Sequence, residues 1–296
     1  MYYKLNTKPF LNTTDNQRVN PDYLQKVLNE HFDSTAFSIF PYIHDKMNSK
    51  QCAKKGAGNC ISFVMRLQDI LKKSSYNKKR GIKSFIIPST IPNSFKRDGY
   101  LPITHVALFV YVNSRYGYII DPAFYMTAPI LVDLQTDKPN QTYMRNMHTG
   151  VDDLIHYNTQ QYDAPIAFHE QQYMPKNTCS VKMRFDKDEM GGMDTWEYFL
   201  REITNPDKAI SNPYINIVKK TPFIIGTKMT DNGVQADCGV YLRDNNVVDI
   251  KNGYTSLYKG DLNTIPPDVL NFVRAKLGKF FTRFNIEPSE GGEIVL

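Results

Sequence analysis

Four short segments rich in β-branched and aromatic residues follow Gly81, and Pro, Gly, Asn and Asp separate them. These segments are Ile82–Pro88, His105–Val112, Tyr116–Asp121 and Ile130–Leu134. Such length and composition between turn residues are typical of strands in an antiparallel sheet. The middle of the chain therefore predicts an antiparallel sheet or a small β-barrel.

Helical periodicity precedes these strands. After Asn20-Pro21, apolar residues at i, i+3 and i+4 predict a helix that closes around His31. A second predicted helix begins at Cys60, and its apolar positions nearly encircle the axis as far as Leu71. A helix with this pattern is buried in the middle of its domain rather than lying on a surface.

The last third of the chain contains both helical and strand patterns. We expect a short helix over 195–203, strands over 214–218, 223–228, 239–243 and 246–250, and an amphipathic helix over 267–284. The order of elements predicts an α+β fold with a helical N-terminal segment, a central antiparallel β-barrel-like domain and a C-terminal α/β lid. The corresponding domains are 1–80, 81–190 and 191–296.

Composition excludes several classes of protein. The 296 residues are 41% hydrophobic, which argues against disorder. The longest clean apolar run, Val106 to Val112, is far shorter than a membrane span, and Met1 to Phe10 lacks the apolar core of a secretory signal. We therefore expect a cytoplasmic protein with no membrane partner.

The net charge of +6 comes from scattered basic clusters that acidic stretches partly match. These clusters are a solvated surface or a patch that attracts an anionic ligand, such as a phosphorylated cofactor. No aromatic-rich nucleic-acid motif accompanies them, which disfavours a nucleic-acid partner.

The cysteines and histidines show no metal-site spacing. Cys52 and Cys60 are eight residues apart, which fits no C-x₂₋₄-C pattern, and the six histidines form no H-x-x-x-H pair. We predict no metal. The four thiols, Cys52, Cys60, Cys179 and Cys238, then raise the question of whether one is a nucleophile.

Cys60 is the candidate, because it opens the predicted buried helix after Gly56-Ala57-Gly58-Asn59. The positive end of a helix stabilises a thiolate and lowers its pKa, and its free N–H groups can bind an oxyanion. The neighbouring glycines would let a substrate approach the backbone. The alternative is a small, buried apolar cysteine.

A thiolate nucleophile needs an imidazole and an orienting carboxylate. His105 begins one predicted strand and Asp121 ends the next, with the turn signal Asn113-Ser114-Arg115 between them. A hairpin centred on Asn113 places His105 directly opposite Asp121, and one centred on Ser114 makes them diagonal neighbours on the same face. The alternative is an edge-strand histidine and a solvent-facing aspartate.

The order Cys, His, Asp resembles the transglutaminase-like and papain-like superfamily, and most closely the arylamine N-acetyltransferases. Three stretches carry the resemblance: Asn20–Asp45, Thr104–Tyr125 and Asn212–Gly233. The family motif Arg-Gly-Gly-x-Cys, followed by Glu and Asn, is replaced here by Gly-Ala-Gly-Asn-Cys without those residues. Asp121-Pro122-Ala123-Phe124 lacks the glycine that precedes the phenylalanine in the family.

The resemblance implies a cysteine acyltransferase. Cys60 would take an acyl group from acetyl-CoA or another acyl-CoA and pass it to a small-molecule amine. His105 would take the thiol proton, Asp121 would hold the imidazolium, and Phe124 would shape the acceptor pocket.

Two other functions stay open. The same three residues serve a papain-like or transglutaminase-like peptidase, isopeptidase or amidase, in which water replaces the amine. The missing family residues also leave room for a non-catalytic relative that keeps the fold as a binding module.

Overall fold

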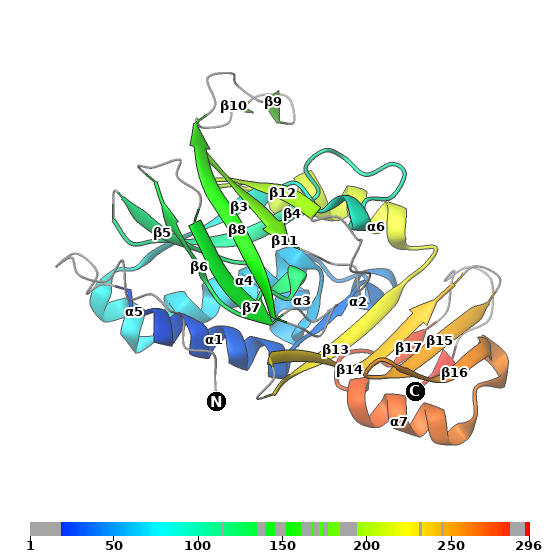
Figure 1. The fold of residues 1–296 in the computed structure, drawn as a ribbon. Helices are drawn as coiled ribbons and strands as arrows, with labels where there is room; N and C mark the ends of the chain where they lie inside the picture. The colour runs from blue at the N-terminus through cyan, green and yellow to red at the C-terminus, as the bar shows by residue number, and fades with distance from the viewer. Residues whose placement is uncertain are drawn as a thin grey trace.

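An eight-stranded antiparallel sheet occupies the middle of the chain in the computed structural model (Figure 1). The structure describes residues 19–113, 115–134, 140–145, 152–161, 167–168, 172–173, 177–183, 194–230, 233–243, 246–284 and 294–296. The strands follow one another in space as β6, β5, β4, β3, β12, β11, β8 and β7. The sheet curls until β6 contacts β8, which gives the predicted barrel-like shape. Its strands are β3 (Lys83–Ser89), β4 (His105–Tyr111), β5 (Tyr116–Ile120), β6 (Ile130–Asp133), β7 (Asn140–Arg145), β8 (Asp152–Gln161), β11 (Asn177–Met183) and β12 (Asp194–Phe199).

A second sheet, of six strands, joins the two ends of the chain. Its order is β16, β15, β14, β13, β1 and β2. The N-terminal strand β1 pairs antiparallel with β13, and β2 pairs parallel with β1. Helix α7 packs on β14 and covers this sheet. The elements are β1 (Ala36–Ser38), β2 (Ala57–Gly58), β13 (Phe223–Thr230), β14 (Gly233–Leu242), β15 (Val247–Asn252), β16 (Thr255–Asp261) and α7 (Pro267–Leu277).

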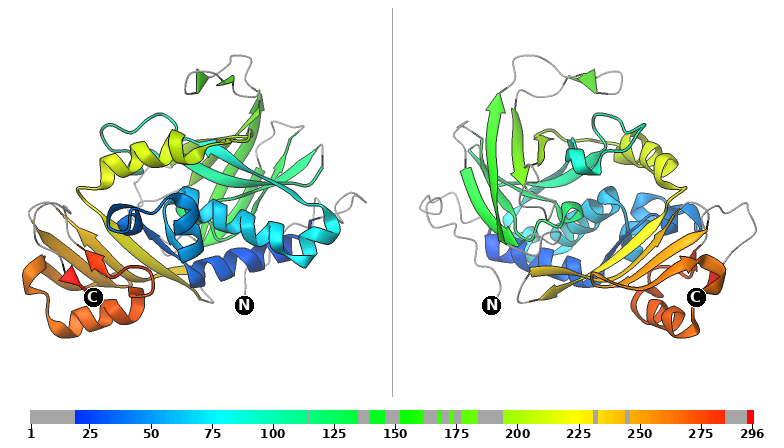
Figure 2. Two further views of the ribbon diagram at one scale, coloured as in Figure 1. Left: turned by 180° about the vertical axis from the view of Figure 1, so that it is seen from behind. Right: turned by 45° about the vertical axis from the view of Figure 1, so that its right-hand side comes forward.

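The N-terminal helices lie beneath the eight-stranded sheet, as the view from behind in Figure 2 shows. Helix α4 contacts α1 on one side and β3 and β4 on the other. Its residues Ile61, Val64, Leu67 and Leu71 are fully buried in the largest core cluster, as the all-round apolar pattern predicts. The helices are α1 (Pro21–Ser34), α2 (Phe40–Ile43), α3 (Ser49–Lys55), α4 (Cys60–Lys73) and α5 (Ser75–Arg80).

Smaller elements complete the described chain. Two two-stranded pairings stand apart from the large sheets, β9 with β10 and β17 with β18. The remaining elements are β9 (Ala167–Phe168), β10 (Gln172–Tyr173), β17 (Arg283–Phe284), β18 (Ile294–Val295), the short helical turns η2 (Asn93–Phe95), η3 (Pro122–Phe124) and η5 (Leu262–Thr264), the π-helical turn η4 (Asp207–Ser211) and α6 (Asn212–Val218).

The fold class is confirmed: a helical segment that carries Cys60, a barrel-like antiparallel sheet and a C-terminal α/β part. The three domain ranges stay a prediction. None of the described helices combines the length and the apolar content that a bilayer-spanning helix needs.

Three predicted elements of the last third are wrong in type or length. We expected a helix over 195–203, but residues 195–199 belong to β12, because Trp196 and Tyr198 alternate into the core at a period of two. Residues 214–218 form part of α6, whose first turn contains Pro213, a residue suited to a helix start. Helix α7 ends at Leu277 because Gly278 follows it, although Phe280 and Phe284 still reach the core.

The glycines before Cys60 serve the packing of the chain itself. Gly56 ends α3 with a φ of 80°, in the left-handed region that favours glycine. A Cβ on Gly58 would lie 2.1 Å from Ser62 Oγ and 2.9 Å from Cys52 Cβ. The expectation that Gly58 leaves room for a substrate is therefore wrong, because side chains of α3 and α4 fill that space.

We expect Gly58→Ala to lower the free energy of unfolding by about 2–3 kcal/mol, since the methyl group must displace packed atoms. Urea denaturation measures the change. Gly81→Ala is the control: Gly81 has a positive φ of 62° but no atom within 4 Å of an added Cβ, so its cost is backbone strain of about 1 kcal/mol. Equal effects of both substitutions would contradict the close packing at Gly58.

Candidate active site

Asn59 fixes the point at which α4 begins and therefore the position of Cys60. Its Oδ1 accepts hydrogen bonds from the backbone N–H groups of Ile61 (3.1 Å) and Ser62 (3.4 Å), as an N-cap residue does. Its own carbonyl accepts from Ser62 Oγ at 2.8 Å. Cys60 is thus held at the first helical position, where only 7% of its surface is exposed.

The same asparagine joins α4 to two other elements, and a residue of a third element completes the network. Tyr42 of α2 donates its hydroxyl to Asn59 Oδ1 at 2.9 Å, and Asn59 Nδ2 donates to Ser211 Oγ of η4 at 3.0 Å. Ser49 of α3 contacts Tyr42 and Ser211 through its hydroxyl, at 2.9 and 3.5 Å. A buried polar network of this kind is rigid when its members are satisfied, so the start of α4 has one defined position.

The hairpin of β4 and β5 brings His105 to Asp121 in the diagonal arrangement. Leu108 pairs with Ile120 and Phe109 with Ile119, so the hairpin is centred on position 114, and the pairing is two residues away from the register that would put His105 directly opposite Asp121. Both residues still lie on one face, and His105 Nε2 is 2.7 Å from Asp121 Oδ2. The expected hydrogen bond between imidazole and carboxylate is present.

Tyr198 is a member of this site that the sequence did not reveal. Its hydroxyl donates to Asp121 Oδ2 at 2.6 Å, next to the bond from His105. Asp121 Oδ1 accepts from the backbone N–H of Phe124 at 3.4 Å and so caps η3. Asp121 is 1% exposed, and these three hydrogen bonds hold its buried carboxylate in one orientation. Tyr198 lies on β12, and only the sheet order β3–β12 brings it here.

The buried imidazole of His105 is stabilised in its charged form. Burial by itself would lower its pKa, but the charges of Asp121 and Cys60 and the hydrogen bonds to both residues together raise the pKa of His105 to about 10. Since Nε2 faces Asp121, Nδ1 is the ring nitrogen left for the Cys60 thiol. These contacts therefore favour the imidazolium form of His105, which is the form that it has after it accepts a proton from Cys60.

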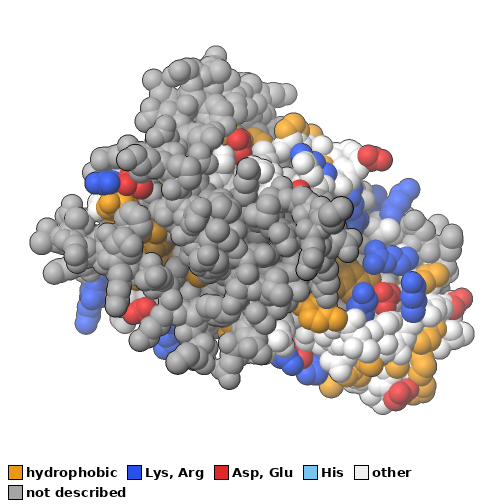
Figure 3. All heavy atoms as spheres, in the orientation of Figure 1, with side chains coloured by type: hydrophobic (Ala, Val, Ile, Leu, Met, Phe, Trp, Pro, Cys, Tyr) orange, Lys and Arg blue, Asp and Glu red, His pale blue; other side chains and the backbone are white. Residues whose placement is uncertain are grey.

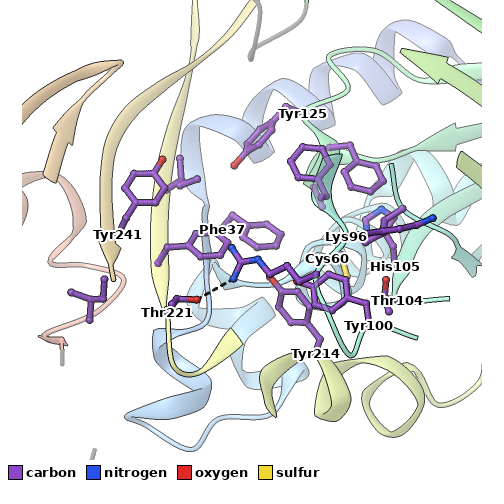
Figure 4. Close-up of a pocket in the computed structure, with 18 of the residues that line it drawn as sticks. Phe37, Cys60, Lys96, Tyr100, Thr104, His105, Tyr125, Tyr214, Thr221 and Tyr241 are labelled. Carbon is purple, nitrogen blue, oxygen red and sulfur yellow. Dashed lines mark hydrogen bonds between the residues drawn. The ribbon is translucent and has the colours of Figure 1, made fainter. Parts of the chain in front are cut away.

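Cys60 and His105 line a pocket of about 380 Å³, a size suited to a small molecule. In the close-up of Figure 4, Cys60, His105, Tyr100 and Tyr214 lie at one end, and Tyr125 and Tyr241 lie across from them. Phe124 lines the same pocket, and its ring centroid is 4.1 Å from that of His105. The predicted site residues Cys60, His105, Asp121 and Phe124 are thus brought together.

Cationic and aromatic side chains form the rest of the pocket wall, and the cations come from the loop before β4 and from the residue after β14. Lys96, Arg97 and Arg243 line it, and Arg97 Nη1 donates to Thr221 Oγ1 at 3.0 Å, the dashed line in Figure 4. The space-filling view in Figure 3 shows Lys and Arg side chains grouped around apolar ones on the right-hand half of this face. The described residues include no carboxylate among the pocket lining. The pocket therefore suits a ligand with an apolar part and an anionic part.

The other three cysteines lie away from this pocket. Cys52, Cys179 and Cys238 are fully buried, and burial raises the pKa of each thiol to about 12. Within the part of the chain that the structure describes, no three His, Cys, Asp or Glu side chains are grouped so that they could hold a metal ion.

One expectation about the helix start needs correction. The free N–H groups of the first turn were expected to bind an oxyanion, but Asn59 Oδ1 already accepts from those of Ile61 and Ser62. The N–H of Cys60 itself is the group that this cap leaves for a substrate oxygen. The helix end still directs its positive dipole toward Cys60.

Comparison with solved structures shows the fold. The structure of Mycobacterium marinum arylamine N-acetyltransferase in complex with CoA matches with a TM-score of 0.52 and 14% identity, over 88% of this chain and 87% of that chain. Another structure of the M. marinum enzyme matches with a TM-score of 0.50 and 13% identity, over the same shares. No protein-family profile and no curated protein sequence matches the chain. The resemblance to arylamine N-acetyltransferases is confirmed as a likeness of fold.

We expect iodoacetamide at neutral pH to label Cys60 before the other thiols. Cys60 lines the pocket beside an imidazole that can take its proton, whereas burial raises the pKa of the other three thiols. Peptide mass spectrometry after short labelling measures the modified fraction of each cysteine. His105→Gln is the matched variant, and in it Cys60 should react more slowly. Equal labelling of all four cysteines would contradict this assignment.

We expect the stability that His105 contributes to decline with rising pH. Its pKa is raised from the ordinary 6.5 to about 10 in the folded protein, so the folded state holds the proton more tightly. The contribution is fully present below pH 6.5 and is lost as pH rises through 10. Denaturant unfolding of the wild type and His105→Gln at several pH values measures it. The stability difference between them should shrink across this window, and a constant difference would contradict the charged imidazole.

Proposed function

We propose that this chain is a cysteine acyltransferase that moves an acetyl or other acyl group from a CoA thioester to a small-molecule amine. The observation that carries this proposal is the sequence of contacts from Asp121 through His105 to Cys60, at the end of a pocket. The fold that this chain shares with arylamine N-acetyltransferase structures supports it. Asp121 acts as the orienting group and His105 as the base.

The chemistry follows from the geometry of these three groups. His105 takes the proton of Cys60, and Asp121 and Tyr198 hold the resulting imidazolium in place. The Cys60 thiolate then attacks the carbonyl carbon of the thioester, and the donor leaves as a thiol after it takes the imidazolium proton. An amine attacks the acyl group on Cys60 in the second half-reaction, with His105 as the general base.

The lining of the pocket supports an acyl-CoA as the donor substrate. Lys96, Arg97 and Arg243 offer positive charge to phosphate groups, and the aromatic wall offers apolar contact to the rest of the molecule. The M. marinum relative of the same fold was solved in complex with CoA, which supports this choice.

The amine acceptor would bind against Phe124. This ring lies over the His105 imidazole and stacks with Phe95, at 5.8 Å between centroids. An acceptor held there would present its nitrogen next to the base. Cytoplasmic location and the absence of nucleic-acid and membrane partners stay predictions.

The test is incubation of the protein with acetyl-CoA, followed by intact-mass measurement. We expect one acetyl group per chain on Cys60, and its removal when a small aromatic amine is added. Cys60→Ala should show no adduct, whereas the matched variant Cys238→Ala should keep it, because Cys238 is buried away from the pocket.

The competing functions give different results in the same experiment. If acetate is released from acetyl-CoA without an amine as fast as the acetyl group is lost with one, the result would favour a hydrolase that uses the same three residues. No adduct with any thioester, together with unreactive Cys60, would favour a non-catalytic binding protein.

A further inference from the structure

The cap on α4 leaves few hydrogen-bond donors for a reacting carbonyl oxygen. When a thiolate attacks a carbonyl, that oxygen becomes negative and usually requires two donors. Asn59 Oδ1 engages the N–H groups of Ile61 and Ser62, so the backbone supplies the N–H of Cys60. A second donor is expected from a side chain that lines the pocket near Cys60.

The hydroxyl of Tyr214 meets this requirement. Tyr214 lines the pocket at the end that contains Cys60, as Figure 4 shows. None of the described residues makes a hydrogen bond to this hydroxyl, so it is available to a ligand. Burial, followed by the charges of Tyr100 and Cys60, raises its pKa well above 10, so it keeps its proton and remains a donor.

Asn59 also holds the segment that leads into the helix of Tyr214. Asn59 Nδ2 donates to Ser211 Oγ at 3.0 Å, and Ser211 precedes the first residue of α6, the helix that carries Tyr214. The Asn59 side chain therefore occupies two backbone N–H donors at the start of α4. It also holds the segment that carries a further donor, the Tyr214 hydroxyl. The Tyr214 ring also packs against Tyr100, with 6.0 Å between centroids.

Two other hydroxyl groups of the pocket compete for this role. Tyr100 also lies at the Cys60 end of the pocket, on the segment between η2 and β4. Thr104 Oγ1 is buried beside His105 and has no hydrogen-bond partner in the described part of the chain. Tyr214 is favoured because it alone is tied to the cap of the cysteine helix.

We propose that the Tyr214 hydroxyl and the Cys60 N–H together donate hydrogen bonds to the carbonyl oxygen of the acyl donor during attack by Cys60. This inference rests on the proposed function. A bond forms between sulfur and the carbonyl carbon, and the π electron pair moves to the oxygen. Its return expels the leaving group, which takes its proton from His105. The proton of Tyr214 stays on Tyr214 throughout.

The test compares two reactions of Cys60 in the full-length protein. Acylation by acetyl-CoA and by p-nitrophenyl acetate creates a negative carbonyl oxygen, whereas alkylation by iodoacetamide creates none. We expect Tyr214→Phe to slow acylation by about 100-fold and to leave the alkylation rate within about twofold. Unchanged alkylation also shows that the variant is folded at the site. Tyr111→Phe, which removes an exposed hydroxyl on β4, should change neither rate.

Four results would overturn the assignment of Tyr214. The first is an equal acylation rate in Tyr214→Phe and the wild type, and the second is a parallel fall in the acylation and alkylation rates of Tyr214→Phe. The third is a change in the KM of Tyr214→Phe alone. The fourth is a loss of acylation rate of about 100-fold in Thr104→Val or Tyr100→Phe but not in Tyr214→Phe. If acetyl-CoA fails to acylate the wild type but p-nitrophenyl acetate succeeds and depends on Tyr214, the proposed donor is wrong and this inference stands. Failure of both donors with the wild type would overturn both.

Discussion

The buried side chain of Asn59 is the contact on which the rest of the site depends. With 1% of its surface exposed, it accepts two N–H groups of α4 and the Tyr42 hydroxyl and donates to Ser211. A buried amide that makes all these bonds tolerates little displacement, because each lost bond leaves an unsatisfied polar group. The position of Cys60 relative to the sheet therefore follows from hydrogen bonding outside the reacting groups.

The parts of the site that the sequence predicts are those set by local geometry. A turn between two alternating strands decides which residues share a face, so His105 and Asp121 could be paired from spacing alone. The uncertainty of one residue in the turn did not matter, because opposite and diagonal neighbours lie on the same side of a sheet. The start of the Cys60 helix was similarly visible, as a change of periodicity after a Gly-rich segment.

The parts that the sequence does not predict depend on contacts between distant segments. Tyr198 reaches Asp121 across 77 residues because β12 lies beside β3. The segment 195–203 was expected to be a helix, and its aromatic residues gave no sign of which strands they would join. The cations of the pocket come from a loop before β4 and from the end of β14, and their meeting depends on how the two sheets pack.

The hydrogen bond between Arg97 and Thr221 crosses from the eight-stranded sheet side of the pocket to the six-stranded sheet side. A molecule that fills the pocket makes contacts with both sheets at once, so its binding energy also holds the two halves of the protein together. Occupancy and folding are then linked by mass action: a ligand present at 100 times its dissociation constant stabilises the folded chain by about 2.7 kcal/mol. The resistance of this protein to heat or proteolysis in a cell would in that way report the local concentration of the molecule that binds in the pocket.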